Sequence, residues 1–157
     1  MIITIDSREQ APFSFLNCAA DVETVKGTLQ VGDYSLAGLE TKISVERKSL
    51  PDLVMCLGQE RERFERELLR AAALEAFAVV VEATWQDLIG GKYRSKLNPG
   101  AAAASVASFM SRYRIAFFFA GNRSNAERFT EGYLRQFLKS KQHELHAIVK
   151  QVGKIFT

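Results

Sequence analysis

The sequence contains little cysteine: of its 157 residues, only Cys18 and Cys56 carry a thiol. Two cysteines this far apart form no Cys-x-x-Cys metal motif, and one possible pair is poor evidence for a disulfide framework. We therefore expect a reducing, cytoplasmic compartment, or a nucleoid-associated location in a prokaryote. The sequence also lacks any apolar stretch approaching ~20 residues, so we expect no membrane-spanning helix.

A large excess of one charge is missing as well. The net charge is +3, with 25% charged and 47% hydrophobic residues, which is typical of a globular domain. Such a balance permits nucleic acid as a partner without arguing for it, so a DNA-binding surface has to come from local clustering. The apolar start of the chain is interrupted at once by Asp6 and Arg8, so we expect no signal peptide.

The order of expected strands and helices indicates the fold class. Apolar or alternating runs predict strands over residues 2–5, 22–30, 34–39, 42–47, 77–82 and 115–120. Helical spacing of apolar residues predicts helices over residues 51–57, 59–74, 85–89, 99–113, 125–139 and 141–157. Strands that cluster early and then alternate with helices predict an α/β fold, with a mixed central sheet flanked by helices on both faces.

Two acids and a lysine stand out in the first third of the chain. Asp33 follows a glycine, and Glu46-Arg47-Lys48 ends the expected strand over residues 42–47. Side chains alternate along a strand, so Glu46 and Lys48 share one face and Arg47 lies on the other. A hairpin over residues 34–48 would bring Asp33 to the same space. Two carboxylates can hold a hard divalent cation, and such a cation beside a lysine suits phosphodiester cleavage.

Each of these charges also has an ordinary structural explanation. A Gly-Asp pair is frequent in turns, where the carboxylate of Asp33 would cap backbone N–H groups. Glu46 and Lys48 could form the solvent face of an edge strand. Ser49-x-x-Asp52 has the pattern of a capping box at a helix start. Asp52 could equally orient a neighbouring cation of the motif, and the two roles are compatible.

The combined pattern resembles the nuclease domain of the XPF family of structure-specific DNA endonucleases. The resemblance is carried by Gly32-Asp33-Tyr34, by Glu46-Arg47-Lys48-x-x-x-Asp52 and by the upstream Asp6-Ser7-Arg8-Glu9. It extends from about residue 2 to about residue 140. It implies a restriction-endonuclease-like core over residues 1–140, to which residues 141–157 add an amphipathic helical extension.

The resemblance also implies roles for individual residues. The expected catalytic set is Asp6, Asp33, Glu46, Arg47, Lys48 and Asp52. Asp33 and Glu46, with the carbonyl of Arg47, would hold Mg²⁺ or Mn²⁺, and Lys48 would position water or stabilise charge on the phosphate. Arg8 and Arg61 would contact DNA, and the implied substrates are branched, flap or fork structures.

Residues 92–96 form a basic stretch after a Gly-Gly pair. Its cations Lys92, Arg94 and Lys96 surround a tyrosine, which suits a surface that follows phosphates and stacks on bases. An ordinary flexible surface loop has the same composition. His143 and His146 lie three apart on an expected helix, but no third metal ligand is near in sequence, so surface positions are favoured.

Apolar residues near the C-terminus suggest assembly. Phe129, Tyr133 and Phe137 recur every four residues, and residues 145–152 extend an apolar stripe. They could belong to the protein's own core, yet exposed apolar patches often mark interfaces. With the resemblance, they predict a homodimer through residues 125–157. Two other functions remain open: a catalytically weak DNA-binding or assembly subunit, and a nuclease acting on RNA or single strands.

Overall fold

Six strands form one central sheet in the computed structural model of the protein, which describes residues 1–155, with side chains as far as residue 152. The strands are β1 (Ile2–Asp6), β2 (Glu23–Gly27), β3 (Tyr34–Leu36), β4 (Ile43–Lys48), β5 (Ala76–Val81) and β6 (Ala116–Phe119). Their order across the sheet is β2-β1-β3-β4-β5-β6. β3 is antiparallel to both neighbours and the other pairs are parallel, which confirms the predicted mixed sheet.

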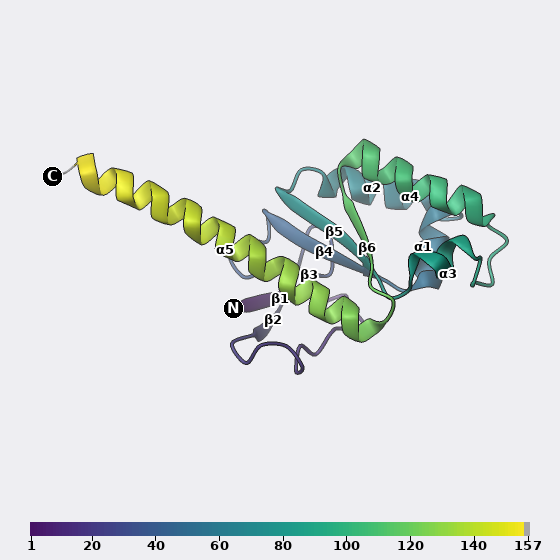
Figure 1. Cartoon of the computed structure of the whole chain (residues 1–157), viewed down its shortest axis with the longest axis horizontal. Coiled ribbons are helices and arrows are strands. Elements are labelled where there is room, and N and C mark those ends of the chain that lie inside the picture. The colour runs from purple at the N-terminus through teal and green to yellow at the C-terminus, as the bar shows by residue number, and fades with distance from the viewer. Residues whose placement is uncertain (156–157) are drawn as a thin grey trace.

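Helices cover both faces of this sheet (Figure 1). They are α1 (Leu50–Leu57), α2 (Arg61–Ala71), α3 (Trp85–Ile89), α4 (Pro99–Tyr113) and α5 (Arg123–Ile155). One apolar core joins α1, α2, α3 and α4 to Phe77, Val79 and Val81 of β5. The second core joins Val80 of β5, with β1, β3 and β4, to α5. The alternation of side chains along β5 thus assigns the first four helices to one face and α5 to the other.

The connection from β4 to α1 determines where the candidate site lies. Ser49 directly follows β4, and its Oγ accepts a hydrogen bond from the N–H of Asp52 at 3.2 Å. Pro51 occupies the first turn of α1, where its missing N–H costs nothing. Because this cap stops the strand and starts the helix within two residues, Glu46 and Lys48 are held at the C-terminal end of β4, close to α1.

The last helix is longer than the sequence predicted. The two expected segments, 125–139 and 141–157, form one unbroken helix as far as Ile155, and residues 156 and 157 lie outside the described residues. The helix extends beyond the body of the protein (Figure 1). Leu145, Ile148, Val149 and Val152 are exposed on this extension. Within residues 1–155, no helix, α5 included, has the length and apolar character needed to cross a membrane.

Candidate active site

The β3–β4 hairpin brings Asp33 to the end of β4, as the sequence predicted. The N–H of Asp33 donates to the carbonyl of Val45 at 2.8 Å, and Oδ2 of Asp33 accepts from the N–H of Arg47 at 2.7 Å. Gly32 makes this close approach possible. Its φ is +80°, and a Cβ there would lie 2.1 Å from Oγ of Ser44, so only glycine fits this turn.

Glu46 and Lys48 lie on one face of β4, as strand alternation predicted. The two side chains form an ion pair, and the ammonium group of Lys48 lies 5.6 Å from the centre of the Phe64 ring. Together with Asp33 they line a cavity of about 320 Å³. The other lining residues are Arg8, Glu9, Gln10, Arg47, Asp52, Met55, Cys56, Glu60 and Arg63. The acids and the lysine of the motif therefore converge on one accessible space.

Burial disfavours the ionised form of both carboxyl groups when no cation is bound. Burial, assisted by the nearby charge of Glu9, raises the pKa of Asp33 to about 6. Burial and the charge of Asp33 raise the pKa of Glu46 well above its usual range. Burial alone would lower the pKa of Lys48, but the neighbouring Glu46 outweighs burial and raises it, so Lys48 carries its charge. The single positive charge of Lys48 does not balance two buried carboxylates, so a further cation would stabilise their ionised form.

The oxygens at this cavity are of the kind that hard divalent cations take as ligands. Across residues 1–155, no cluster of three or more His, Cys, Asp and Glu side chains is arranged to hold a metal. The available oxygens are the Asp33 and Glu46 carboxylates and a main-chain carbonyl. The N–H and C=O of one strand residue point to the same edge, and the N–H of Arg47 points to Asp33. The carbonyl of Arg47 therefore also faces Asp33.

The side chain of Arg47 lies on the opposite face of β4 and braces it. Its guanidinium pairs with Glu9 at 3.1 Å and with Glu82 at 3.4 Å. Glu9 follows β1 and Glu82 follows β5, so one arginine ties three segments together beside the cavity. Burial would raise the pKa of Glu9, but the hydrogen bonds from Arg47 keep it below its usual range.

Asp6 is buried and holds Arg8 rather than pointing at the two acids. Its carboxylate accepts from Nε of Arg8 at 2.7 Å, from Nη2 of Arg8 at 2.9 Å and from the N–H of Leu29 at 2.7 Å. The hydrogen bond from Arg8 lowers the pKa of Asp6 to about 2. Both residues line a second cavity of about 310 Å³, which also reaches Asp33, Glu46 and Lys48. Asp6 is thus placed to support the site indirectly.

The position of Asp52 is compatible with both roles that the sequence left open. Its N–H completes the cap of α1, and its carboxylate accepts a hydrogen bond from Oγ of Ser49 at 2.6 Å. Its exposed side chain also lines the 320 Å³ cavity beside Lys48. The role of Asp52 in catalysis stays a prediction.

Arg61 lies away from the two acids. It donates to Oγ of Ser105 at 2.7 Å and pairs with Glu65 at 3.2 Å, and its guanidinium lies 4.7 Å from the centre of the Phe109 ring. These contacts join α2 to α4, and DNA contact by Arg61 remains a prediction.

Sequence reasoning missed three other side chains of α2. Arg63, Glu67 and Arg70 line the 310 Å³ cavity together with residues of the candidate site. They are spaced by four and three residues, so they share one helix face. The buried Phe64, Leu68 and Ala71 orient that face. The position of Arg63, Glu67 and Arg70 directly beside this apolar stripe was the sequence signal that could have identified them.

The basic loop adjoins the site through α1. Arg94 and Lys96 line a groove of about 760 Å³ with Met55 and Leu97, and Met55 also lines the 320 Å³ cavity. Lys92 instead pairs with Asp87 at 2.8 Å. Two of the three predicted cations therefore line a groove that shares Met55 with the 320 Å³ cavity.

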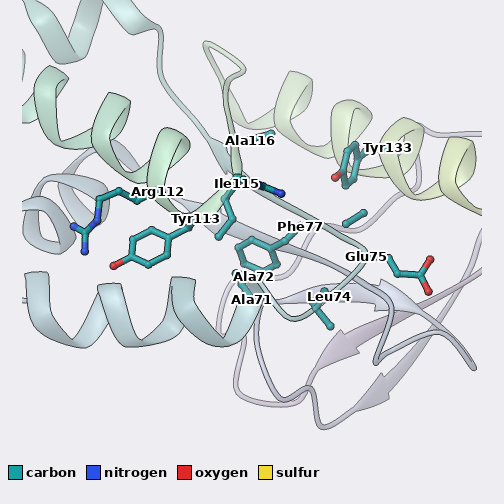
Figure 2. A pocket seen from close by; sticks show the side chains of 12 residues that line it. Ala71, Ala72, Leu74, Glu75, Phe77, Arg112, Tyr113, Ile115, Ala116 and Tyr133 are labelled. Atoms are coloured by element: carbon teal, nitrogen blue, oxygen red, sulfur yellow. The ribbon is translucent and has the colours of Figure 1, made fainter.

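Another pocket, of about 520 Å³, lies at the opposite end of the parallel strands. Figure 2 shows Phe77 and Ile115 between Tyr113 on one side and Tyr133 on the other. The one carboxylate in its lining belongs to Glu75, which pairs with lysines. This pocket has no counterpart of the paired acids, so the candidate active site is the cavity at the end of β4.

Two comparisons with known proteins found matches to this chain. The ERCC4 domain matches residues 5–132. XPF from Aeropyrum pernix has a similar structure, with a TM-score of 0.70 and 22% identity, covering 87% of this chain and 61% of that one. A structure of XPF from Aeropyrum pernix in complex with DNA gives 0.70 and 23%, covering 88% and 66%. No curated protein matches the sequence.

The structural likeness, at this level of identity, establishes the restriction-endonuclease-like fold that the motif implied. This chain spans less than two thirds of the length of either Aeropyrum chain. The ERCC4 match covers most of the sequence, including Asp33 and the Glu46-Arg47-Lys48 run. The chain therefore belongs to the ERCC4 domain family, as an XPF-type nuclease domain.

Proposed function

We propose that the protein is a metal-dependent DNA endonuclease that hydrolyses phosphodiester bonds. The observation that carries this proposal is the convergence of Asp33, Glu46 and Lys48 in one cavity, with both acids raised in pKa by burial. Perturbed acids in a cleft are typical of functional sites. Membership of the ERCC4 family supports the reaction class, and the DNA complex of the Aeropyrum XPF supports DNA as the substrate.

Asp33, Glu46 and the carbonyl of Arg47 would hold Mg²⁺ or Mn²⁺. When bound, such an ion supplies Lewis-acid activation of water and charge neutralisation at the phosphate. The protein's own part is to orient the oxygens. The N–H of Arg47 fixes Asp33, and the β4–α1 connection fixes Glu46.

Lys48 would position the attacking water and stabilise charge that develops on the phosphate. The ion pair with Glu46 keeps its ammonium group at the cavity, and its charge is retained. Asp52 would orient this end of the site from the first turn of α1. Asp6 would act through Arg8, whose exposed guanidinium lines the cavity and would contact a phosphate. A preorganised cation in a partly buried site stabilises charge more effectively than the same cation in water.

The DNA path would run from the catalytic cavity over α1 to the basic loop. Arg8 marks one side of the cavity, and Arg94 and Lys96 border the groove on the other. Lys92 and Arg61 lie further along the same side of the sheet, each already engaged by an acid. We infer that branched DNA, such as a flap or fork, is the preferred substrate, in line with the resemblance to structure-specific nucleases.

We further propose a homodimer through the region from residue 125 to the C-terminus. Phe129 and Tyr133 pack against the core, and Phe118 stacks on Phe129 with ring centres 3.8 Å apart, leaving Phe118 itself partly exposed. The apolar stripe at residues 145–152 is exposed on the projecting part of α5. Exposed apolar surface of this kind supports an interface.

Cleavage of labelled flap, fork, duplex and single-stranded DNA tests the proposal. Each substrate is incubated with Mg²⁺, with Mn²⁺ and with EDTA, beside the Glu46→Gln variant. We expect metal-dependent nicking near the branch of flap and fork DNA, which EDTA and the variant abolish. Tight DNA binding without cleavage under every metal condition would instead support the alternative of a catalytically weak DNA-binding subunit.

A further inference from the structure

We propose that Arg123, the first residue of α5, is a positioning residue for the metal site. The inference rests on the proposed function, because it assigns to Arg123 the task of holding Asp33 ready for a divalent cation. Arg123 touches neither Asp33 nor Glu46. It reaches Asp33 through two separate chains of contacts. One runs through Glu82 to Arg47, whose main-chain N–H bonds Asp33, and the other runs through the loop that follows β1.

Arg123 joins the end of β5 to the loop after β1. Its Nη1 pairs with Oε1 of Glu82 at 2.9 Å. Its Nη2 donates to the carbonyl of Ala11 at 2.7 Å and to that of Pro12 at 2.9 Å. The guanidinium plane also lies 4.9 Å from the centre of the Phe13 ring. A guanidinium can satisfy all these partners at once because its donors form a rigid planar fork.

The first chain of contacts runs through Glu82. Glu82 lies between Arg123 and Arg47, and the Arg47 guanidinium is shared between Glu82 at 3.4 Å and Glu9 at 3.1 Å. The N–H of Arg47 then holds Oδ2 of Asp33 at 2.7 Å. Arg123 and Arg47 therefore compete for the carboxylate of Glu82. This competition determines how the Arg47 guanidinium is divided between Glu82 and Glu9.

The second chain runs through the aromatic residues. Phe13 stacks on Tyr34 with ring centres 4.9 Å apart, and the N–H of Phe13 donates to the Tyr34 hydroxyl at 2.9 Å. Tyr34 is the residue after Asp33. One turn along α5, Glu127 accepts a hydrogen bond from the N–H of Phe15 at 2.5 Å. The start of α5 therefore binds the same loop through both Arg123 and Glu127. The loop thus packs against Tyr34, the residue that directly follows Asp33.

Removal of Arg123 should disturb both chains. Glu82 would lose one of its two arginines and draw Arg47 away from Glu9. The Phe13 ring and the carbonyls of Ala11 and Pro12 would lose their common partner. Asp33 would keep its hydrogen bond to the main-chain N–H of Arg47, but the end of β4 and Tyr34 would be held less firmly, so the acids would be less well oriented for a cation. Partners that orient a metal ligand typically change metal affinity or activity by about 10–100-fold when they are removed.

The test is Mn²⁺ binding by isothermal titration calorimetry, without DNA. The variants are Arg123→Ala, Arg123→Lys, Glu82→Gln and the Arg123→Ala/Glu82→Gln double variant. The matched control is Arg128→Ala, which removes an exposed arginine further along the same helix. We expect Arg123→Ala to weaken Mn²⁺ binding by about tenfold. Arg123→Lys should recover most of this loss, since the ammonium still pairs with Glu82. Arg128→Ala should match the wild type.

Glu82→Gln keeps the test informative if Arg123→Ala is poorly folded, because it interrupts the first chain of contacts while Arg123 stays in place. Effects on one chain of contacts are not additive, so the double variant should bind Mn²⁺ no more weakly than the weaker single variant. A lower melting temperature with unchanged Mn²⁺ affinity in Arg123→Ala and Glu82→Gln would overturn the inference and leave only a structural role. Failure of the wild type itself to bind Mn²⁺ would instead overturn the proposed function.

Discussion

Asp33 accepts a hydrogen bond from the main-chain N–H of Arg47 at 2.7 Å, so the first acid of the site is attached to the strand that carries the second. The N–H that makes this bond belongs to the peptide that joins Glu46 to Arg47, directly before Lys48. Any movement of β4 therefore moves both acids and the lysine together. This rigidity suits a site that has to present two oxygens at a fixed separation.

Neutralising either acid should abolish cleavage without weakening DNA binding. Asp33→Asn and Glu46→Gln remove the charge that would hold the cation, so we expect a loss of cleavage of at least about 1,000-fold, or about 4 kcal/mol of transition-state stabilisation. DNA affinity in EDTA, measured by fluorescence anisotropy, should stay near the wild-type value.

The same variants test the burial of the acids. Because burial raises the pKa of Asp33 to about 6, its ionised form destabilises the folded protein at pH 8 when no metal is bound. Asp33→Asn should therefore melt at or above the wild-type temperature in EDTA. A lower melting temperature, or full cleavage by either variant, would contradict the proposed site.

Replacing Lys48 by alanine should separate metal binding from turnover. The ammonium repels a cation and competes for Glu46, so its removal should leave Mn²⁺ affinity unchanged or tighter. Turnover at saturating metal should fall by about 100–1,000-fold, because charge developing on the phosphate loses its stabiliser. Titration calorimetry and single-turnover cleavage measure the two quantities. Collapsed metal affinity with normal turnover would show that Lys48 has a different role.

The basic loop should contribute about two phosphate contacts rather than three. Arg94 and Lys96 border the groove beside Met55, whereas Lys92 is paired with Asp87. The slope of log affinity against log salt changes by about 0.9 for each phosphate contact on duplex DNA. Arg94→Ala/Lys96→Ala should therefore flatten the slope by about 1.8, and Lys92→Ala should change it little. An unchanged slope in the double variant would make the loop an ordinary surface loop.

Acid should destabilise the protein partly through Asp6. The hydrogen bond from Arg8 lowers its pKa to about 2 from an ordinary 3.8. An acid with a depressed pKa in the folded state stabilises the fold above its unfolded pKa, and this contribution disappears as pH falls through the folded value. About 2 kcal/mol should therefore be lost between about pH 4 and pH 2.

Urea unfolding from pH 7 downward measures this loss. Asp6→Asn and Arg8→Gln each remove one partner of the pair, so both should show a shallower fall in unfolding free energy below pH 4 than the wild type. Equal slopes in all three proteins would show that the pair contributes nothing to acid stability.

The projecting part of α5 should carry the subunit contact. Ile148→Asp and Val152→Asp place charge in the exposed apolar stripe, so both should shift the protein from a dimer towards the monomer mass of 17.6 kDa in light scattering. His146→Glu, on the same exposed segment, serves as the control and should leave the mass at that of the dimer. A wild-type protein of 17.6 kDa at micromolar concentration, with full nuclease activity, would contradict the homodimer.

Much of the architecture and the centre of the site followed from local patterns in the sequence. Alternation in β4 placed Glu46 and Lys48 on one face and Arg47 on the other, because side-chain direction in a strand depends only on position along the chain. The Ser49-x-x-Asp52 cap and the β3–β4 hairpin are equally local. Such features are determined by a few neighbouring residues, and the sequence predicts them well.

Tertiary structure decided what depends on contacts between distant segments. The network of Glu9, Arg47, Glu82 and Arg123 joins residues up to 112 positions apart, since Arg123 also binds the carbonyl of Ala11. No spacing rule relates such positions. Arg61 contacts α4, whereas Arg63 faces the cavity. The sequence does not predict this difference, because the packing of α2 against the sheet decides which side of a charged helix meets the site.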